Sequence, residues 1–310
     1  MQFRWRTANI GAEMHWHGLL DHSNVPGRRF AEFESLCREA KALESLQGTQ
    51  LKADVAILLS FENEYAFKLQ PQTEGYYYLE QLQRIHLALT KLGLNVDIIG
   101  QHEKLDGYKV VVAPEMYVKN DDVVERLHAF AEQGGTVVMT TRSGVKDEHN
   151  NAIMAQLPTV YRDMAGVYAE EYAPIGCDSV TVRFADGEEL QAKQWCDVLH
   201  AEGAQVLAEY AGDYFAGAPA ITRNAYGEGA VYYIGTVGHQ ALYDKLLRSV
   251  AQEAALPVLE GIPARVEITT REGDGRKVRF AFNNDDKAHS FVLDGCSIEL
   301  APFEMKVIEA

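Results

Sequence analysis

The densest group of side chains that could do chemistry lies near the start of the sequence, between residues 3 and 22. This stretch holds two arginines, one glutamate, two tryptophans and three histidines. Aromatic faces can stack on the C–H bonds of a sugar ring, and arginine, glutamate and histidine can hydrogen-bond its hydroxyl groups. A strand with a purely structural role would not need so many polar groups so close together. The pattern therefore predicts sugar binding.

Two other interpretations of this stretch stay open. His15 and His17, followed by Asp21 and His22, could supply metal ligands. A zinc site, however, needs three or four converging ligands that are themselves held by hydrogen bonds. The stretch could also be an exposed polar loop, because a sugar site needs walls that so short a segment lacks. We expect no metal and no cofactor.

Composition and charge restrict the possible partners. The 310 residues carry a net charge of −16, which repels nucleic acid and anionic membrane surfaces. We see no run of apolar residues long enough to span a membrane and no apolar signal-peptide core near the N-terminus. The four cysteines, Cys37, Cys177, Cys196 and Cys296, are far apart and form no metal or disulfide pattern. We expect a cytoplasmic protein with neither a nucleic acid nor a membrane partner.

The middle of the chain has the alternating pattern of an α/β domain. Asp54–Ser60 is a continuous apolar run, typical of a parallel strand that is buried on both faces. Periodicity predicts further strands and helices after it: strands at 96–99, 109–114 and 136–141, and helices at 78–92 and from Asn120 or Asp121 to Gly134. This order predicts an open, flavodoxin-like parallel sheet.

The flanking regions have other patterns. Residues 166–226 predict antiparallel strands at 179–184, 189–198 and 205–210, and a hairpin pairs 219–223 with 229–234 before a helix at 239–254. After Pro257, a small all-β domain is predicted with strands at 265–270, 277–282, 289–293 and 305–308. At the other end, a strand at 1–8 and a helix at 28–47, capped by Gly48, would form one βα unit.

Several short sequence motifs occur in a fixed order along the chain. They are Phe3-Arg4-Trp5-Arg6, Gly11-Ala12-Glu13 and His17-Gly18, then Tyr108–Pro114, Gly134–Val138 and Arg142–Glu148, and finally Tyr226–Gly229. In this order they resemble the family-42 glycoside hydrolases, which are β-galactosidases. The resemblance covers essentially all 310 residues. It identifies residues 1–50 as the last βα unit of a catalytic (β/α)8 barrel, 51–257 as a trimerisation domain with the class I glutamine-amidotransferase fold, and 258–310 as a small β domain.

The resemblance also implies a function. The family hydrolyses terminal β-galactosides with retention, which requires two carboxyl groups about 5–5.5 Å apart. Both catalytic glutamates lie on barrel strands that precede the segment resembling residues 3–6, so no catalytic residue is assigned to this chain. We expect it to be inactive alone and to form homotrimers. The alternative is a free-standing assembly or carbohydrate-binding module without a catalytic barrel.

Substrate-binding residues follow from the same resemblance. The family binds galactose through a glutamate and a histidine three residues later. Glu13 matches the glutamate, but Trp16 stands at the histidine position. His15 or His17 then takes that role through a local shift, and Trp16 lies beside the sugar.

Two segments of the middle domain, residues 114–117 and 61–67, lie where a site could form. An amidotransferase nucleophile would lie at the turn after residues 110–113, where the sequence reads Pro114-Glu115-Met116-Tyr117 and offers neither cysteine nor serine. We therefore expect no amidase activity. Phe61–Phe67 follows the first strand and is predicted as a loop that helps to shape the sugar entrance, or else as an ordinary solvated loop.

Overall fold

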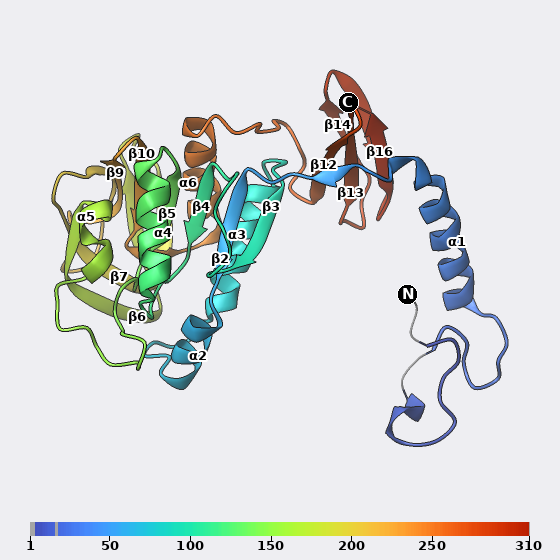
Figure 1. Ribbon diagram of the computed structural model, residues 1–310, viewed down its shortest axis with the longest axis horizontal. Coiled ribbons are helices and arrows are strands. Elements are labelled where there is room, and N and C mark those ends of the chain that lie inside the picture. Colours follow the sequence, from blue (N-terminus) through green and yellow to red (C-terminus); the bar gives the residue numbers. More distant parts are fainter. Residues whose placement is uncertain (1–3, 16–17, 310) are drawn as a thin grey trace. The chain divides into compact units, whose positions relative to one another are not determined.

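The computed structural model describes residues 4–15 and 18–309, which divide into two compact units (Figure 1). The first unit comprises residues 1–50 with 273–276, and the second comprises 51–272 with 277–310. No helix among the described residues is long and apolar enough to cross a membrane.

The first unit is built on one helix, α1 (Arg28–Ala42), with the short 3-10 helices η1 (Ala12–His15) and η2 (Glu44–Leu46). The predicted strand at 1–8 is wrong for the described residues 4–8, where Arg6 forms only an isolated bridge with Leu20. A strand needs a neighbour along its length to satisfy its backbone groups. The predicted helix end at Gly48 is also wrong. Leu43 caps α1, and Gly48 follows the 3-10 turn with a φ of +91°.

A ten-stranded mixed sheet forms the second unit. Five neighbouring strands are parallel in the order β10-β5-β4-β2-β3: Gly229–Ile234, Thr136–Thr140, Val110–Ala113, Val55–Leu59 and Val96–Gly100. In chain order this arrangement is 5-4-3-1-2, the strand order of flavodoxin-like sheets. The predicted parallel strands and the antiparallel strands predicted after them therefore belong to one mixed sheet.

The antiparallel half extends outward from β10. Its strands are β9 (Pro219–Tyr226), β8 (Gln205–Tyr210), β6 (Val167–Phe184), β7 (Glu189–Ala201) and β11 (Thr236–Gly238). The predicted turn at Asp186-Gly187 joins β6 to β7. β6 begins twelve residues earlier than the predicted strand at 179, because bulges around Gly176 let it continue past interruptions in the pattern.

Both faces of the parallel half are buried, as its continuous apolar runs predict. In β2, Val55 and Ile57 join one core cluster while Ala56 and Leu58 join the other. α3 (Tyr78–Thr90) and α6 (Gln240–Glu253) cover the first face, and α4 (Asp121–Glu132) and α5 (Arg162–Ala165) cover the second (Figure 1). The side chain of Asn120 caps α4 by accepting a hydrogen bond from the Val123 amide at 3.3 Å.

The predicted loop at Phe61–Phe67 is instead a helix, α2 (Phe61–Leu69). Ser60 caps it by accepting a hydrogen bond from the Asn63 amide at 3.2 Å. Because Asn63, Ala66 and Phe67 are buried, the inward face of α2 mixes polar and apolar residues, and the apolar periodicity of a helix is weak in the sequence.

The C-terminal part of the chain contains five short strands: β12 (Val266–Gly273), β13 (Arg276–Asn283), β14 (His289–Leu293), β15 (Cys296–Leu300) and β16 (Met305–Glu309). β12, β13 and β16 form a sheet with the short β1 (Gln50–Leu51), and β14 pairs with β15. β15 was not predicted. A separate core cluster, which includes Val266, Ile268 and Phe291, holds these strands together.

A close backbone approach at Gly229 gives a test of this fold. A Cβ atom there would lie 2.2 Å from the Gly135 carbonyl oxygen and 2.5 Å from that of Ala131. We expect Gly229→Ala to lower the free energy of unfolding by about 1–3 kcal/mol, because neither backbone atom can move freely.

Gly212→Ala is the matched control, since only a methyl group of Val180, at 3.8 Å, lies near its Cβ position. Urea unfolding of both variants measures the difference. Equal stabilities would contradict the packing of β10 against the end of α4.

Candidate functional site

The N-terminal segment presents Glu13 on a loop whose two ends are tied together. The amides of Leu19 and Leu20 donate hydrogen bonds to the carbonyl oxygens of Arg4 and Trp5, at 2.9 and 2.8 Å. Gly18 fits closely there, because a Cβ atom would lie 2.5 Å from the Thr7 nitrogen. Residues 4–7 are therefore held beside residues 18–20, and η1 lies on the loop that joins these two segments.

Glu13 forms an ion pair with Arg4, and about half of its side chain is exposed. Residues 4–9 and Asn24 line an open hollow of about 550 Å³ beside it. A partly exposed carboxylate next to an arginine can accept hydrogen bonds from sugar hydroxyl groups. Of the predicted sugar-binding residues, Glu13 and His15 both lie on η1, whereas Trp16 and His17 lie outside the described residues.

The metal interpretation concerns His15, His17, Asp21 and His22, of which His17 lies outside the described residues. Among residues 4–15 and 18–309, no three histidine, cysteine, aspartate or glutamate side chains gather closely enough to hold a metal ion. His22 instead makes a 2.8 Å contact between its Nε2 and the Ala8 carbonyl oxygen.

The second candidate region is the carboxyl edge of the parallel strands, where open α/β sheets usually bind ligands. Directly after β4, Glu115 occupies a sharp turn with a φ of +36°. Its amide donates a 2.8 Å hydrogen bond to the Thr140 hydroxyl, and its side chain is fully buried. Burial raises the pKa of this carboxyl group to about 8. A carboxyl group that is fully buried does not face a substrate as a nucleophile.

Arg142 lies beneath the same edge in an aromatic cage. Its guanidinium carbon is 3.8 Å from the ring centre of Tyr172 and 4.6 Å from that of Trp195. One of its nitrogens donates a 3.1 Å hydrogen bond to Gln72, whose own amide donates to the Tyr117 hydroxyl at 2.9 Å. The arginine is only 1% exposed, so it supports the fold from inside and is closed to solvent.

Asp197 supplies the negative charge near this arginine. Its carboxylate accepts hydrogen bonds from the Tyr233 hydroxyl at 3.0 Å and from the Arg142 amide at 3.4 Å. Burial raises the pKa of Asp197, and the charge of Arg142 opposes that rise. The positive charge of Arg142 therefore favours the ionised form of Asp197 inside the domain.

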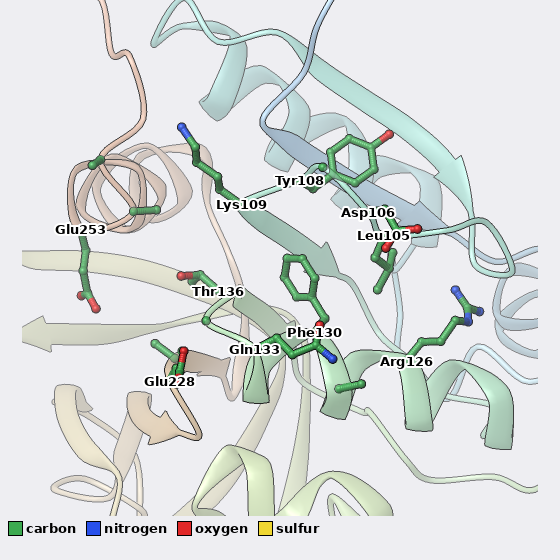
Figure 2. A pocket seen from close by; sticks show the side chains of 18 of the residues that line it. Leu105, Asp106, Tyr108, Lys109, Arg126, Phe130, Gln133, Thr136, Glu228 and Glu253 are labelled. Atoms are coloured by element: carbon green, nitrogen blue, oxygen red, sulfur yellow. The ribbon is translucent and has the colours of Figure 1, made fainter.

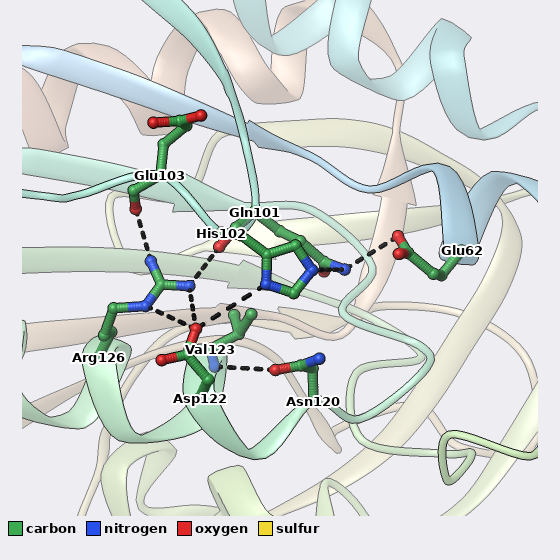
Figure 3. A network of polar contacts seen from close by, with 8 residues as sticks. All are labelled: Glu62, Gln101, His102, Glu103, Asn120, Asp122, Val123 and Arg126. Atoms are coloured by element: carbon green, nitrogen blue, oxygen red, sulfur yellow. Dashed lines mark hydrogen bonds and ion pairs between the residues drawn. The ribbon is translucent and has the colours of Figure 1, made fainter.

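A polar network joins the ends of β3, α2 and α4 along this edge (Figure 3). Arg126 on α4 donates hydrogen bonds to the carbonyl oxygens of Glu103 and Gln101, at 2.5 and 2.6 Å. The Gln101 side chain in turn donates to Glu62 on α2 at 2.9 Å. Two of these three bonds satisfy carbonyl groups of the loop after β3, so the network holds this loop against α4 and α2.

A larger pocket of about 810 Å³ lies at the opposite, amino end of the strands (Figure 2). Three of the cations that line it have partners: Lys109 pairs with Asp54 at 3.3 Å, Arg126 with Asp122 at 3.0 Å, and Arg223 forms an ion pair with Glu253. The pocket is also far from the edge that doubly wound sheets use for binding. Its size alone does not make it a functional site.

The comparisons with known proteins show that this chain is similar to β-galactosidases. Residues 53–257 match the family model described as the β-galactosidase trimerisation domain. β-Galactosidase BgaA of Clostridium cellulovorans is 42% identical over 322 aligned residues, which cover 100% of this chain and 49% of that protein. The crystal structure of a β-galactosidase from Bacillus circulans sp. alkalophilus matches with a TM-score of 0.91 and 28% identity, and that from Rahnella sp. R3 with 0.93 and 27%.

Each of these structural matches covers 99% of this chain, and 49% and 48% of the respective crystallised chains. The chain thus spans about half the length of the relatives that it matches.

The electrostatic coupling between Arg142 and Asp197 can be tested by a double-mutant cycle. Arg142→Met should lower the free energy of unfolding by about 3–5 kcal/mol, because it leaves a buried carboxylate without its counter-charge. Adding Asp197→Asn removes that charge and should recover a large part of the loss. Urea unfolding of the two single variants and the double variant measures the coupling, and strictly additive effects would contradict it.

Proposed function

We propose that this chain supplies the assembly domain and part of the sugar-binding site of a retaining β-galactosidase. The chain belongs to the family-42 β-galactosidases, because residues 53–257 match their trimerisation domain. The observation that carries the proposal is the match of residues 53–257 to the trimerisation domain, within a similarity to β-galactosidases that extends over the whole chain. We also propose three parts: a barrel-derived segment (1–50), an amidotransferase-like trimerisation domain (51–257) and a small β domain (258–310).

Glu13 is the proposed galactose-binding carboxylate. Its support is its position on η1, its exposure and its pairing with Arg4, which orients the carboxylate while leaving oxygen lone pairs available to hydroxyl groups. His15, Trp16 and His17 complete the proposed contacts, with one of the two histidines replacing the histidine of the family pattern. The substrate is a terminal β-galactoside, and the proposed location is the cytoplasm.

Helix α1 favours a role within a larger catalytic fold over the alternative of a free-standing module. None of its residues is buried, although Phe30, Phe33 and Leu36 recur at helical spacing. Leu36 is 58% exposed, and Phe30 has an edge contact with Trp5 at 5.9 Å between ring centres. An apolar helix face of this kind gains stability when another layer covers it, as the outer helix of a (β/α)8 barrel is covered.

The assembly part of the proposal predicts a closed homotrimer. Because three copies related by a threefold axis satisfy one heterologous interface without leaving free ends, a single species is expected. Light scattering after size-exclusion chromatography should give three times the 34.5 kDa of one chain. A monomer mass at every concentration up to the solubility limit would contradict this assembly.

The catalytic part predicts that the pure 310-residue chain does not hydrolyse a chromogenic β-galactoside, since it would lack the pair of carboxyl groups that flank the scissile bond. A long incubation with nitrophenyl β-galactoside, read by absorbance, measures this. Turnover by the wild-type chain that Glu13→Gln abolishes would overturn the assignment of catalysis to residues outside this chain.

A further inference from the structure

Glu115 is a buried acid that the proposed function does not use. It stands where β4 turns towards α4, and its side chain is fully buried. Within the described chain, neither of its carboxyl oxygens has a hydrogen-bond partner of normal geometry. An ionised carboxylate in such a place would lose its hydration with little compensation, whereas a neutral carboxylic acid would lose much less.

The groups that face Glu115 come from four elements and the segment before α3. They are Thr140 of β5, Tyr76 just before α3, Tyr78 at the start of α3, Tyr243 of α6 and, further away beyond Tyr78, Glu64 of α2. The hydroxyl groups of Thr140 and Tyr76 partly oppose the effect of burial on the Glu115 pKa. Within the described chain, no lysine or arginine lowers that pKa. Lys68 is paired with Glu64 at 2.7 Å. The charge of Arg84 lowers the pKa of Tyr243 and so acts against the rise that burial causes there.

The turn that carries Glu115 is tied directly to α2. The Val118 amide donates a 2.8 Å hydrogen bond to the Asn63 side chain, which is itself buried on α2. The ring of Phe67, also on α2, packs 4.5 Å from Tyr117 and 4.8 Å from Tyr76, measured between ring centres. A charge at Glu115 would therefore appear beneath the contacts that hold α2 against the sheet.

We propose that the folded domain holds Glu115 as a neutral carboxylic acid and that its ionisation releases residues 114–118 and α2 from the sheet edge. The turn thus acts as a pH-sensitive switch built into the domain. Its effect extends to the surface, because α2 carries Phe61, Tyr65 and Leu69 on its exposed side.

The direction of the pH dependence follows from linkage. Burial raises the pKa of Glu115 from 4.5 to about 8 in the folded state. The folded chain then keeps a proton that the unfolded chain has already lost. The contribution of Glu115 to stability is complete below pH 4.5, decreases as the pH rises from there to about 8, and is constant above that value.

The first test compares urea unfolding of the full chain with that of Glu115→Gln between about pH 5 and pH 9. Since glutamine resembles the neutral acid and does not titrate, the folding constant of the wild type relative to the variant should fall by up to about tenfold per pH unit and level off near pH 8. Glu125→Gln, on the exposed side of α4, is the matched control and should follow the wild type. A ratio of wild type to Glu115→Gln that does not change with pH would overturn the proposal.

Hydrogen exchange locates the response. In the wild type, the amides of Asn63 and Val118 should lose protection relative to Glu115→Gln as the pH passes about 8, while core amides of β5 keep theirs. Equal loss in both proteins would contradict a local switch at this turn.

Infrared spectroscopy of the wild type keeps the proposal testable if Glu115→Gln does not fold. A carbonyl band of a protonated carboxylic acid should persist at neutral pH and disappear around pH 8. Its absence at pH 7 would show that Glu115 is ionised there, and the proposal would fail.

Discussion

The burial of the five parallel strands on both faces is the constraint on which the rest of the domain depends. Residues of β2 and β4 alternate between two core clusters, so neither face of this half-sheet can be left open. Helices must cover both sides, and right-handed crossovers place them there. The antiparallel strands lie beyond β10 in the order of the sheet, and they extend the same sheet and the same two cores. One domain therefore holds both kinds of strand pairing.

This constraint also determines what happens at the carboxyl edge. In open α/β sheets that edge usually carries a ligand site at the point where the strand order reverses. Here the reversal lies between β2 and β4, and the space beside it contains the buried side chains of Glu115 and Asn63 with several tyrosine rings. At this point the edge is filled with buried side chains, as in a core.

Much of the middle domain could be predicted from the sequence, because apolar runs and helical periodicity are strong there. Local residue types predicted the 219–234 hairpin and a cap at Asn120 or Asp121, and the structure shows that Asn120 is the cap. Helix α2 could not be predicted in this way, since its inward face includes the polar Asn63 and Glu64, which lie buried only in the tertiary structure. The end of α1 at Ala42 was missed for a related reason. A glycine at position 48 indicates a turn but does not show which of two successive turns ends the helix.

The candidate site was only partly accessible to sequence reasoning. Resemblance pointed to Glu13, and the structure adds its ion pair with Arg4, which no spacing rule predicts because nine residues separate them. The buried roles of Glu115 and Arg142 depend on contacts between distant segments, and the only sequence signal for Glu115 was its position after an apolar strand.

The most direct test of the central claim is the activity of a chimera in which this chain replaces the matching part of the Clostridium cellulovorans β-galactosidase. If residues 4–15 complete a galactose site, the chimera should hydrolyse a chromogenic β-galactoside. Glu13→Gln should then lower kcat/KM by roughly 10–100-fold, the range expected when a hydrogen bond to a charged group is lost. A folded chimera without activity, or one that Glu13→Gln leaves unchanged, would contradict the account.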